Sequence, residues 1–130
     1  MKRLRVLVAD DHKAMLEHLV RMLDAEFDVV AAVRDGGAVL TEAARVSPDV
    51  LVLDISMPVM SGIAAADRLK ASGSTAKVVF VTMHHDREFV QESAALGVVG
   101  FVVKDRLVSD LVPAIHSVLD GRPFISSSVR

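Results

Sequence analysis

The chain has 130 residues, a net charge of −2 and no cysteine. Its length suits one domain with a substantial core, and its 52% share of hydrophobic residues argues against disorder. The lack of cysteine excludes disulfides and thiolate metal sites, which fits a reducing cytoplasm, and the interspersed charges disfavour a basic nucleic-acid-binding surface.

Short runs of aliphatic and β-branched residues alternate with longer amphipathic stretches. No run approaches the ~20 apolar residues that span a bilayer, so we expect no membrane segment. Near-continuous hydrophobicity predicts strands covered on both faces, as in parallel sheets. The predicted strands are Leu4–Ala9, Asp28–Val33, Val50–Leu53, Val78–Thr82 and Gly100–Val103.

Helices are predicted between these strands. The first has apolar residues at i, i+3, i+4 and i+7 within Leu16–Leu23. The second contains Val39–Ala44 and should end before Pro48, because proline disfavours helical geometry in the residue before it. Mixed-polarity helical stretches follow at Asp67–Lys70 and Asp86–Val90.

The last helix is predicted around the apolar stripe of Leu111–Leu119. If Ser109 is its N-cap, Pro113 falls at the edge of the first turn, where a missing N–H costs little. Gly121 is a stop signal, and the serine-rich residues 123–130 are interpreted as the start of a linker or C-terminal tail.

Five strands alternating with five helices predict an α/β fold. With right-handed crossovers, the helices cover both faces of a parallel sheet in a three-layer sandwich. Residues 1–122 are assigned to this single domain. Periodicity alone leaves the strand order open.

Polar residues fall at the carboxyl ends of four predicted strands. They are Asp10 and Asp11 after the first strand, Asp54 after the third, Thr82 at the end of the fourth and Lys104 after the fifth. In open α/β sheets the ligand crevice lies beyond the carboxyl ends of the strands. We therefore expect three acids, a hydroxyl and an ammonium to meet at one edge.

Three carboxylates at one edge would repel one another unless a cation joined them. An oxygen-only ligand set favours Mg²⁺ over zinc or copper. The presence of a lysine, Lys104, beside the metal is explained if an anion also binds there and the ammonium neutralises one of the anion's oxygens. A phosphoryl group meets these requirements, and a carboxylate can act as its nucleophile. Asp11 could alternatively cap the first helix, but the neighbouring acids favour metal binding.

Four motifs, in order and each at a strand end, resemble the receiver domains of bacterial two-component response regulators. They are VADDH at 8–12, LDISMPVMSG at 53–62, VT at 81–82 and GFVVK at 100–104. The run around Asp54 is the most specific, because its acid, Met-Pro and glycine all match the family's spacing. The resemblance extends from about Leu4 to Gly121.

This resemblance implies a flavodoxin-like (CheY-like) sheet of order 2-1-3-4-5. It implies that Asp54 is the phosphoacceptor. Mg²⁺ would be bound by Asp11, Asp54 and the backbone carbonyl of Ser56. Asp10 would act largely through a metal-bound water, and Lys104 would contact a phosphoryl oxygen.

The resemblance also implies a conformational switch. Thr82 would turn inward to the phosphoryl group, and Phe101 would fill the space that it leaves. Many family members carry tyrosine at the position of Phe101, whose side chain lacks the hydroxyl. Ser56 and His84 occupy positions that face the phosphoryl group, so we expect them to set the phosphorylated lifetime.

The expected donor is the phosphohistidine of a sensor histidine kinase. The segments at 110–115 and 121–126 resemble receivers joined to LuxR-type helix-turn-helix domains, which favours transcriptional output through a DNA-binding domain beyond Arg130. A homodimer would pair two such domains. The alternative is a stand-alone receiver that signals by protein–protein interaction.

Two enzyme classes are disfavoured, so a phosphoacceptor signalling domain is expected rather than an enzyme. A haloacid-dehalogenase-type phosphatase needs a second acid two residues after its nucleophile, where Ser56 stands. A Rossmann enzyme needs a Gly-x-Gly-x-x-Gly motif after the first strand, and none is present. The pair His84-His85 lacks a third metal ligand and is interpreted as part of a loop.

Overall fold

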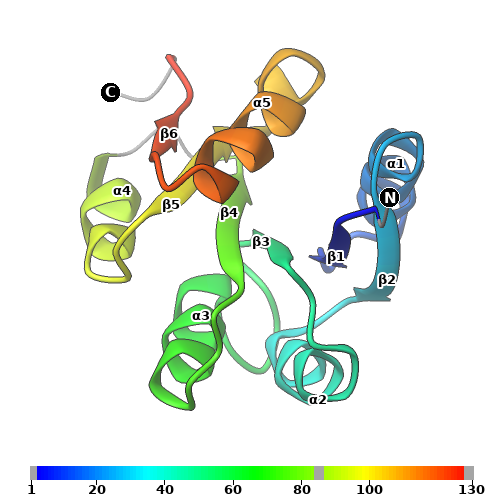
Figure 1. The fold of residues 1–130 in the computed structure, drawn as a ribbon, viewed down its shortest axis with the longest axis vertical. Helices are drawn as coiled ribbons and strands as arrows, with labels where there is room; N and C mark the ends of the chain where they lie inside the picture. Colours follow the sequence, from blue (N-terminus) through cyan, green and yellow to red (C-terminus); the bar gives the residue numbers. More distant parts are fainter. Residues whose placement is uncertain (1–2, 84–86, 128–130) are drawn as a thin grey trace.

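The computed structural model of the chain describes residues 3–83 and 87–127. Its centre is a parallel sheet with strand order β2-β1-β3-β4-β5-β6 (Figure 1). The strands are β1 (Arg5–Ala9), β2 (Asp28–Val33), β3 (Val50–Asp54), β4 (Lys77–Thr82), β5 (Val99–Val103) and β6 (Phe124–Ile125). The predicted order of the first five strands is confirmed, and β6 is a two-residue addition at the edge.

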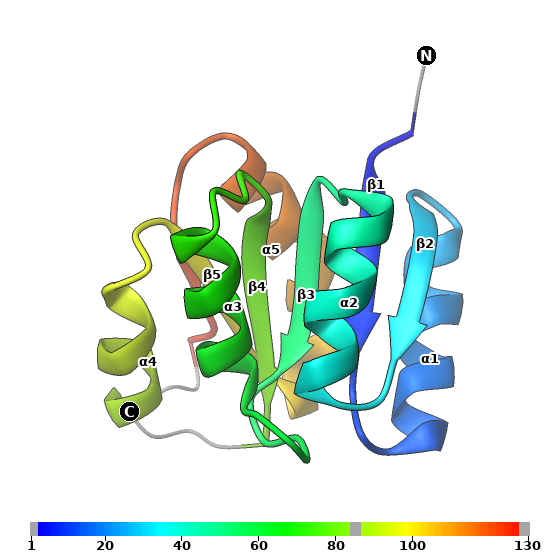
Figure 2. The ribbon, with the colours of Figure 1, turned by 90° about the horizontal axis from the view of Figure 1, so that it is seen from below.

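Helices cover both faces of this sheet, as predicted. They are α1 (Lys13–Asp24), α2 (Gly36–Val46), α3 (Gly62–Ala71), α4 (Arg87–Ala94) and α5 (Leu107–Leu119), with a 3₁₀ turn, η1, at Lys104–Arg106. Figure 2 shows α2, α3 and α4 on one face, with α1 and α5 behind the sheet. In the part of the chain that the structure describes, no helix has both the length and the hydrophobicity needed to cross a bilayer.

Alternating side chains of each central strand build two separate cores. In β1, Val6 and Val8 pack in the core beneath α1 and α5, while Leu7 and Ala9 pack beneath α2 and α3. All four side chains are fully buried. The continuous hydrophobic runs of the sequence are thus explained by central strands that are covered on both faces.

The predicted start of α5 is wrong. The helix begins at Leu107, with Arg106 rather than Ser109 at the N-cap position, so Pro113 lies inside it. Leu107 is 4% exposed and extends the buried stripe by one turn, so packing favours the earlier start. Pro113 and Ser109 are exposed, where water can satisfy the Ser109 carbonyl that proline leaves unpaired.

Ser126, near the end of the described chain, forms hydrogen bonds with β5 and α5. Its N–H donates to the Phe101 carbonyl (2.9 Å), and its hydroxyl accepts from the Val103 N–H (3.1 Å) while donating to Asp110 Oδ2 (2.7 Å). Ser126 and Asp110 are both buried. The serine-rich composition did not predict this packing; the assignment of 123–130 to a linker stays a prediction.

Replacing Ser126 with alanine should lower the free energy of unfolding by about 1–3 kcal/mol. The substitution leaves the Val103 N–H and the Asp110 carboxylate each short of a buried partner. Urea denaturation followed by circular dichroism measures the change. The control is Ser127→Ala at the exposed neighbouring serine, and an equal effect of the two substitutions would contradict the assigned role of Ser126.

Candidate functional site

Strand register brings the predicted polar residues together at one edge of the sheet. Ala9 pairs with Leu53, so Asp10 and Asp54 lie level at the ends of β1 and β3. Asp54 pairs with the residue before Thr82, and Thr82 pairs with the residue before Lys104. The prediction that these side chains share one edge is confirmed.

Gly62 allows α3 to begin directly against the end of β3. A Cβ at this position would lie 2.1 Å from the Asp54 carbonyl oxygen, so any side chain would force the two segments apart. The Gly62 N–H donates to the Ile55 carbonyl (2.8 Å), and Ser61 caps the helix by accepting from the Ala64 N–H. The glycine of the Asp54 motif is therefore a requirement of close packing.

Lys104 places its ammonium between two buried carboxylates. Its Nζ lies 2.8 Å from Asp10 Oδ2 and 3.4 Å from Asp54 Oδ2. The lysine side chain is 5% exposed and that of Asp10 is fully buried. Because water is largely excluded, the attraction between these charges is stronger than at an open surface.

Asp11 lies at the solvent side of the same group. Its side chain is 29% exposed, but its Oδ1 is buried and has no hydrogen-bond partner. The N-cap position of α1 belongs to His12, whose N–H donates to Asp10 Oδ1 (2.9 Å). The alternative role of Asp11 as the N-cap is therefore not observed.

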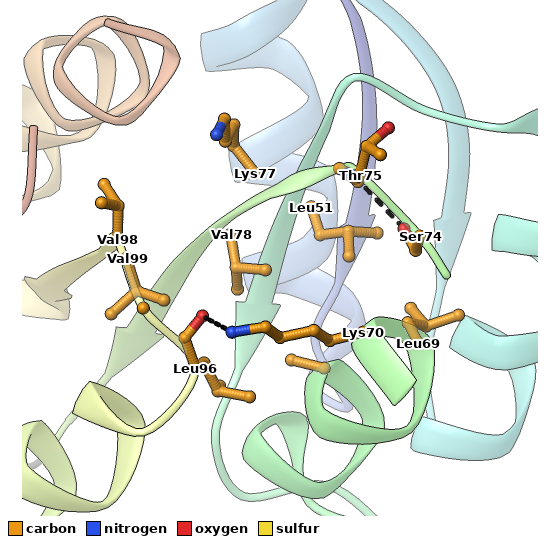
Figure 3. Close-up of a pocket in the computed structure, with 13 residues that line it drawn as sticks. Leu51, Leu69, Lys70, Ser74, Thr75, Lys77, Val78, Leu96, Val98 and Val99 are labelled. Carbon is orange, nitrogen blue, oxygen red and sulfur yellow. Dashed lines mark hydrogen bonds between the residues drawn. The ribbon is translucent and has the colours of Figure 1, made fainter. Parts of the chain in front are cut away.

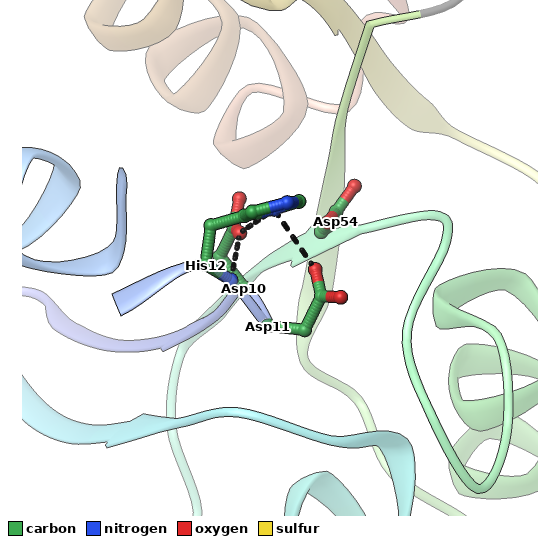
Figure 4. Close-up of side chains that lie close together, drawn as sticks. All are labelled: Asp10, Asp11, His12 and Asp54. Carbon is green, nitrogen blue, oxygen red and sulfur yellow. Dashed lines mark hydrogen bonds and ion pairs between the residues drawn. The ribbon is translucent and has the colours of Figure 1, made fainter. Parts of the chain in front are cut away.

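The three carboxylates and the His12 imidazole form a group that can hold a metal ion. One ligand atom from each of Asp10, Asp11, His12 and Asp54 lies within 4.8 Å of the others (Figure 4). The oxygen-rich donor set fits a hard divalent cation such as Mg²⁺, and the buried Oδ1 of Asp11 accepts no hydrogen bond that would compete with such a cation. His12 was not predicted as a member of this group, although its position directly after the two acids was the available signal.

The other predicted residues occupy different surroundings. Ser56 lines a cavity of about 450 Å³ together with Asp11. Thr82 is 1% exposed at the end of β4, and Phe101 is 1% exposed in the core beneath α2 and α3. His84 lies outside the described residues. The switch, lifetime and carbonyl-ligand roles of these residues stay predictions.

Burial raises the pKa of the Asp54 carboxyl to about 6. The negative charge of Asp10 acts in the same direction, whereas Lys104 opposes both effects. With this pKa the carboxyl is mostly ionised at neutral pH, but its buried charge costs free energy that further positive charge nearby would offset. A bound cation would therefore favour the carboxylate form that a nucleophile requires.

A second cavity, of about 350 Å³, lies at the opposite edge of the sheet (Figure 3). Its lining is mainly aliphatic and contains no carboxylate among the residues that the structure describes. Lys70 crosses it and donates from Nζ to the Leu96 carbonyl (2.7 Å). This cavity shares none of the acidic residues of the first site.

Comparisons with known proteins agree with this geometry. The profile of the response regulator receiver domain matches residues 6–116. The transcriptional regulatory protein MctR of Rhizobium johnstonii is 34% identical over 130 residues, which cover 98% of this chain and 60% of MctR. Response regulator GacA of Pseudomonas viridiflava is 33% identical over 97% of this chain and 60% of its own length. The chain thus spans about three fifths of these relatives.

Solved structures show the same similarity. A LuxR-family two-component response regulator from Aurantimonas sp. SI85-9A1 has a TM-score of 0.91 and 28% identity, covering 98% of this chain and 93% of that protein. The signal receiver domain of NarL from Mycobacterium tuberculosis has a TM-score of 0.87 and 31% identity, and the match covers 94% of this chain and 100% of that domain.

Replacing Asp54 with asparagine should stabilise the metal-free protein at neutral pH. With the pKa raised from 3.8 to about 6, the folded state binds more protons than the unfolded state between these values, so the free energy of unfolding falls as pH rises through this window. In total, ionisation of the buried Asp54 carboxyl lowers the free energy of unfolding by roughly 3 kcal/mol, and this full loss is present above pH ~6.

Urea denaturation in EDTA at several pH values measures this effect. Asp54→Asn should exceed the natural chain in stability at pH ~7, and the difference should disappear below pH ~4. Asp67→Asn on the exposed surface of α3 is the matched control. A difference that is the same at every pH would contradict the raised pKa.

Proposed function

The chain belongs to the response regulator receiver family, and on this basis we propose that Asp54 accepts a phosphoryl group from the phosphohistidine of a sensor histidine kinase. The observation that carries the proposal is the buried Asp54 carboxylate beside the Lys104 ammonium and two further acids. It is a signalling role, in which the protein is itself phosphorylated.

The transfer is a nucleophilic displacement. An Asp54 carboxylate oxygen attacks phosphorus, an O–P bond forms, and the N–P bond to the donor histidine breaks with its electron pair leaving on the imidazole. Lys104, whose Nζ lies 3.4 Å from Asp54 Oδ2, would neutralise a phosphoryl oxygen, and the Thr82 hydroxyl would donate a hydrogen bond to another.

A divalent cation fits this acidic group. Mg²⁺ would be held by Asp11, Asp54 and the Ser56 carbonyl, with Asp10 acting at longer range, and would supply positive charge beside the phosphoryl oxygens. Asp10 also keeps Lys104 in place through their 2.8 Å contact. The side chains at positions 56 and 84 would then control how quickly water removes the phosphoryl group.

The output that we propose is transcription. The relatives MctR and GacA are a transcriptional regulatory protein and a response regulator, and each is longer than this chain. Binding of the phosphoryl group by Thr82 would move Phe101 and favour another arrangement of β5 and its neighbouring helices. That change would promote formation of a homodimer, and a domain beyond Arg130 would then bind DNA. The protein would act in the cytoplasm.

Incubation with acetyl phosphate and Mg²⁺ should add one phosphoryl group to the natural chain. Mass spectrometry of the intact protein should show this gain, which EDTA and the Asp54→Asn substitution should each abolish because they remove the cation and the nucleophile. Asp67→Asn should be phosphorylated like the natural chain. A gain that persists in Asp54→Asn would overturn the assignment of the phosphoacceptor.

Replacing Lys104 with methionine should slow this phosphorylation by about 100-fold, because one group that stabilises the developing charge is lost. Intact-protein mass spectrometry at timed intervals gives the rate. Lys70→Met, at a lysine on the opposite edge of the sheet, serves as the control. An unchanged rate in a folded Lys104→Met protein would contradict the role of the ammonium.

A further inference from the structure

His12 holds its imidazole over the acidic group. Its Nδ1 lies 3.2 Å from Asp11 Oδ1 and 3.5 Å from Asp10 Oδ1, and Figure 4 shows the ring bridging these two side chains. The ring is 74% exposed, so it approaches the carboxylates from the solvent side. The His12 imidazole therefore lies on the solvent side of the acidic group.

The local fold does not explain a histidine at this position. His12 is the N-cap residue of α1, but its side chain makes no capping hydrogen bond, and Ser, Thr, Asp or Asn would serve better there. An exposed ion pair with Asp11 contributes little to stability. Neither helix capping nor core packing accounts for this side chain.

The acids beneath the ring offer a reason for it. Asp11 Oδ1 is buried without a hydrogen-bond partner, and it is the carboxylate oxygen nearest to the imidazole nitrogen. Ligand atoms of Asp10, Asp11, His12 and Asp54 lie within 4.8 Å of one another, a spacing that one cation can bridge. Imidazole nitrogen differs from the oxygen ligands because it suits transition metals better than Mg²⁺.

We propose that His12 Nδ1 is a ligand of the divalent cation in this site, which gives the site a mixed nitrogen and oxygen donor set. This inference rests on the divalent-cation site of the proposed function. The mixed set binds ions that accept imidazole, such as Mn²⁺ and Co²⁺, more tightly relative to Mg²⁺ than the carboxylates and a carbonyl would alone. Mg²⁺ retains water at the position that the imidazole takes on the other ions.

Pulsed electron paramagnetic resonance of Mn²⁺ bound to the untagged chain tests the bond directly. The natural chain should show nitrogen coupling from a coordinated imidazole. The coupling should disappear when excess Mg²⁺ displaces the Mn²⁺, and it should be absent from Asp11→Asn. His12→Ala should lose the coupling. His18→Ala, at an exposed histidine on α1 outside the acidic group, should keep it and is the matched control.

Isothermal titration measures the selectivity. His12→Ala should weaken Co²⁺ binding roughly tenfold while changing Mg²⁺ binding by less than about twofold. If the natural chain binds Mg²⁺ and Mn²⁺ but shows no nitrogen coupling, or if His12→Ala and His18→Ala behave alike, the inference is overturned and the proposed function stands. If the natural chain binds neither ion at Asp11 and Asp54, both are overturned.

Discussion

The ammonium of Lys104 lies within ion-pair distance of two carboxylates that folding has withdrawn from water. Burying Asp10 and Asp54 is costly, and the mutual repulsion of their charges adds to the cost. The lysine offsets part of it, yet the pKa of Asp54 remains raised, so the site still lacks positive charge. This deficit makes the site receptive to a cation. The same ammonium then lies beside the oxygen that would become phosphorylated.

This arrangement depends on the parallel sheet. Because the central strands run in one direction, the residue that follows each of them reaches the same edge, and the register sets their heights. The buried faces of those strands pack between two helical layers. Gly62 then lets the next helix begin against Asp54. The chemistry is thus a consequence of strand direction, register and one close approach.

Much of this could be predicted from the sequence because hydrophobic runs and the polar residues that end them are local signals. The first five strands and the meeting of Asp10, Asp54 and Lys104 followed from that pattern. The start of α5 could not be predicted, because the packing of Leu107 outweighed a proline that suggested a later start. Ser126 was missed because its partners on β5 and α5 lie far from it in sequence. The orientation of the His12 ring likewise depends on the folded acids.

A crystal structure of the chain with Mg²⁺ and trifluoroberyllate, an analogue of a phosphoryl group, would show directly whether Asp54 is the phosphoacceptor. We expect beryllium to be bonded to an Asp54 carboxylate oxygen, with fluorides in contact with Lys104 and Thr82 and the cation on Asp11. The Lys104 ammonium should then move from its position between Asp10 and Asp54 toward a fluoride. An analogue bound to another residue, or a Lys104 that makes no contact with it, would show that Asp54 or Lys104 does not have the proposed role.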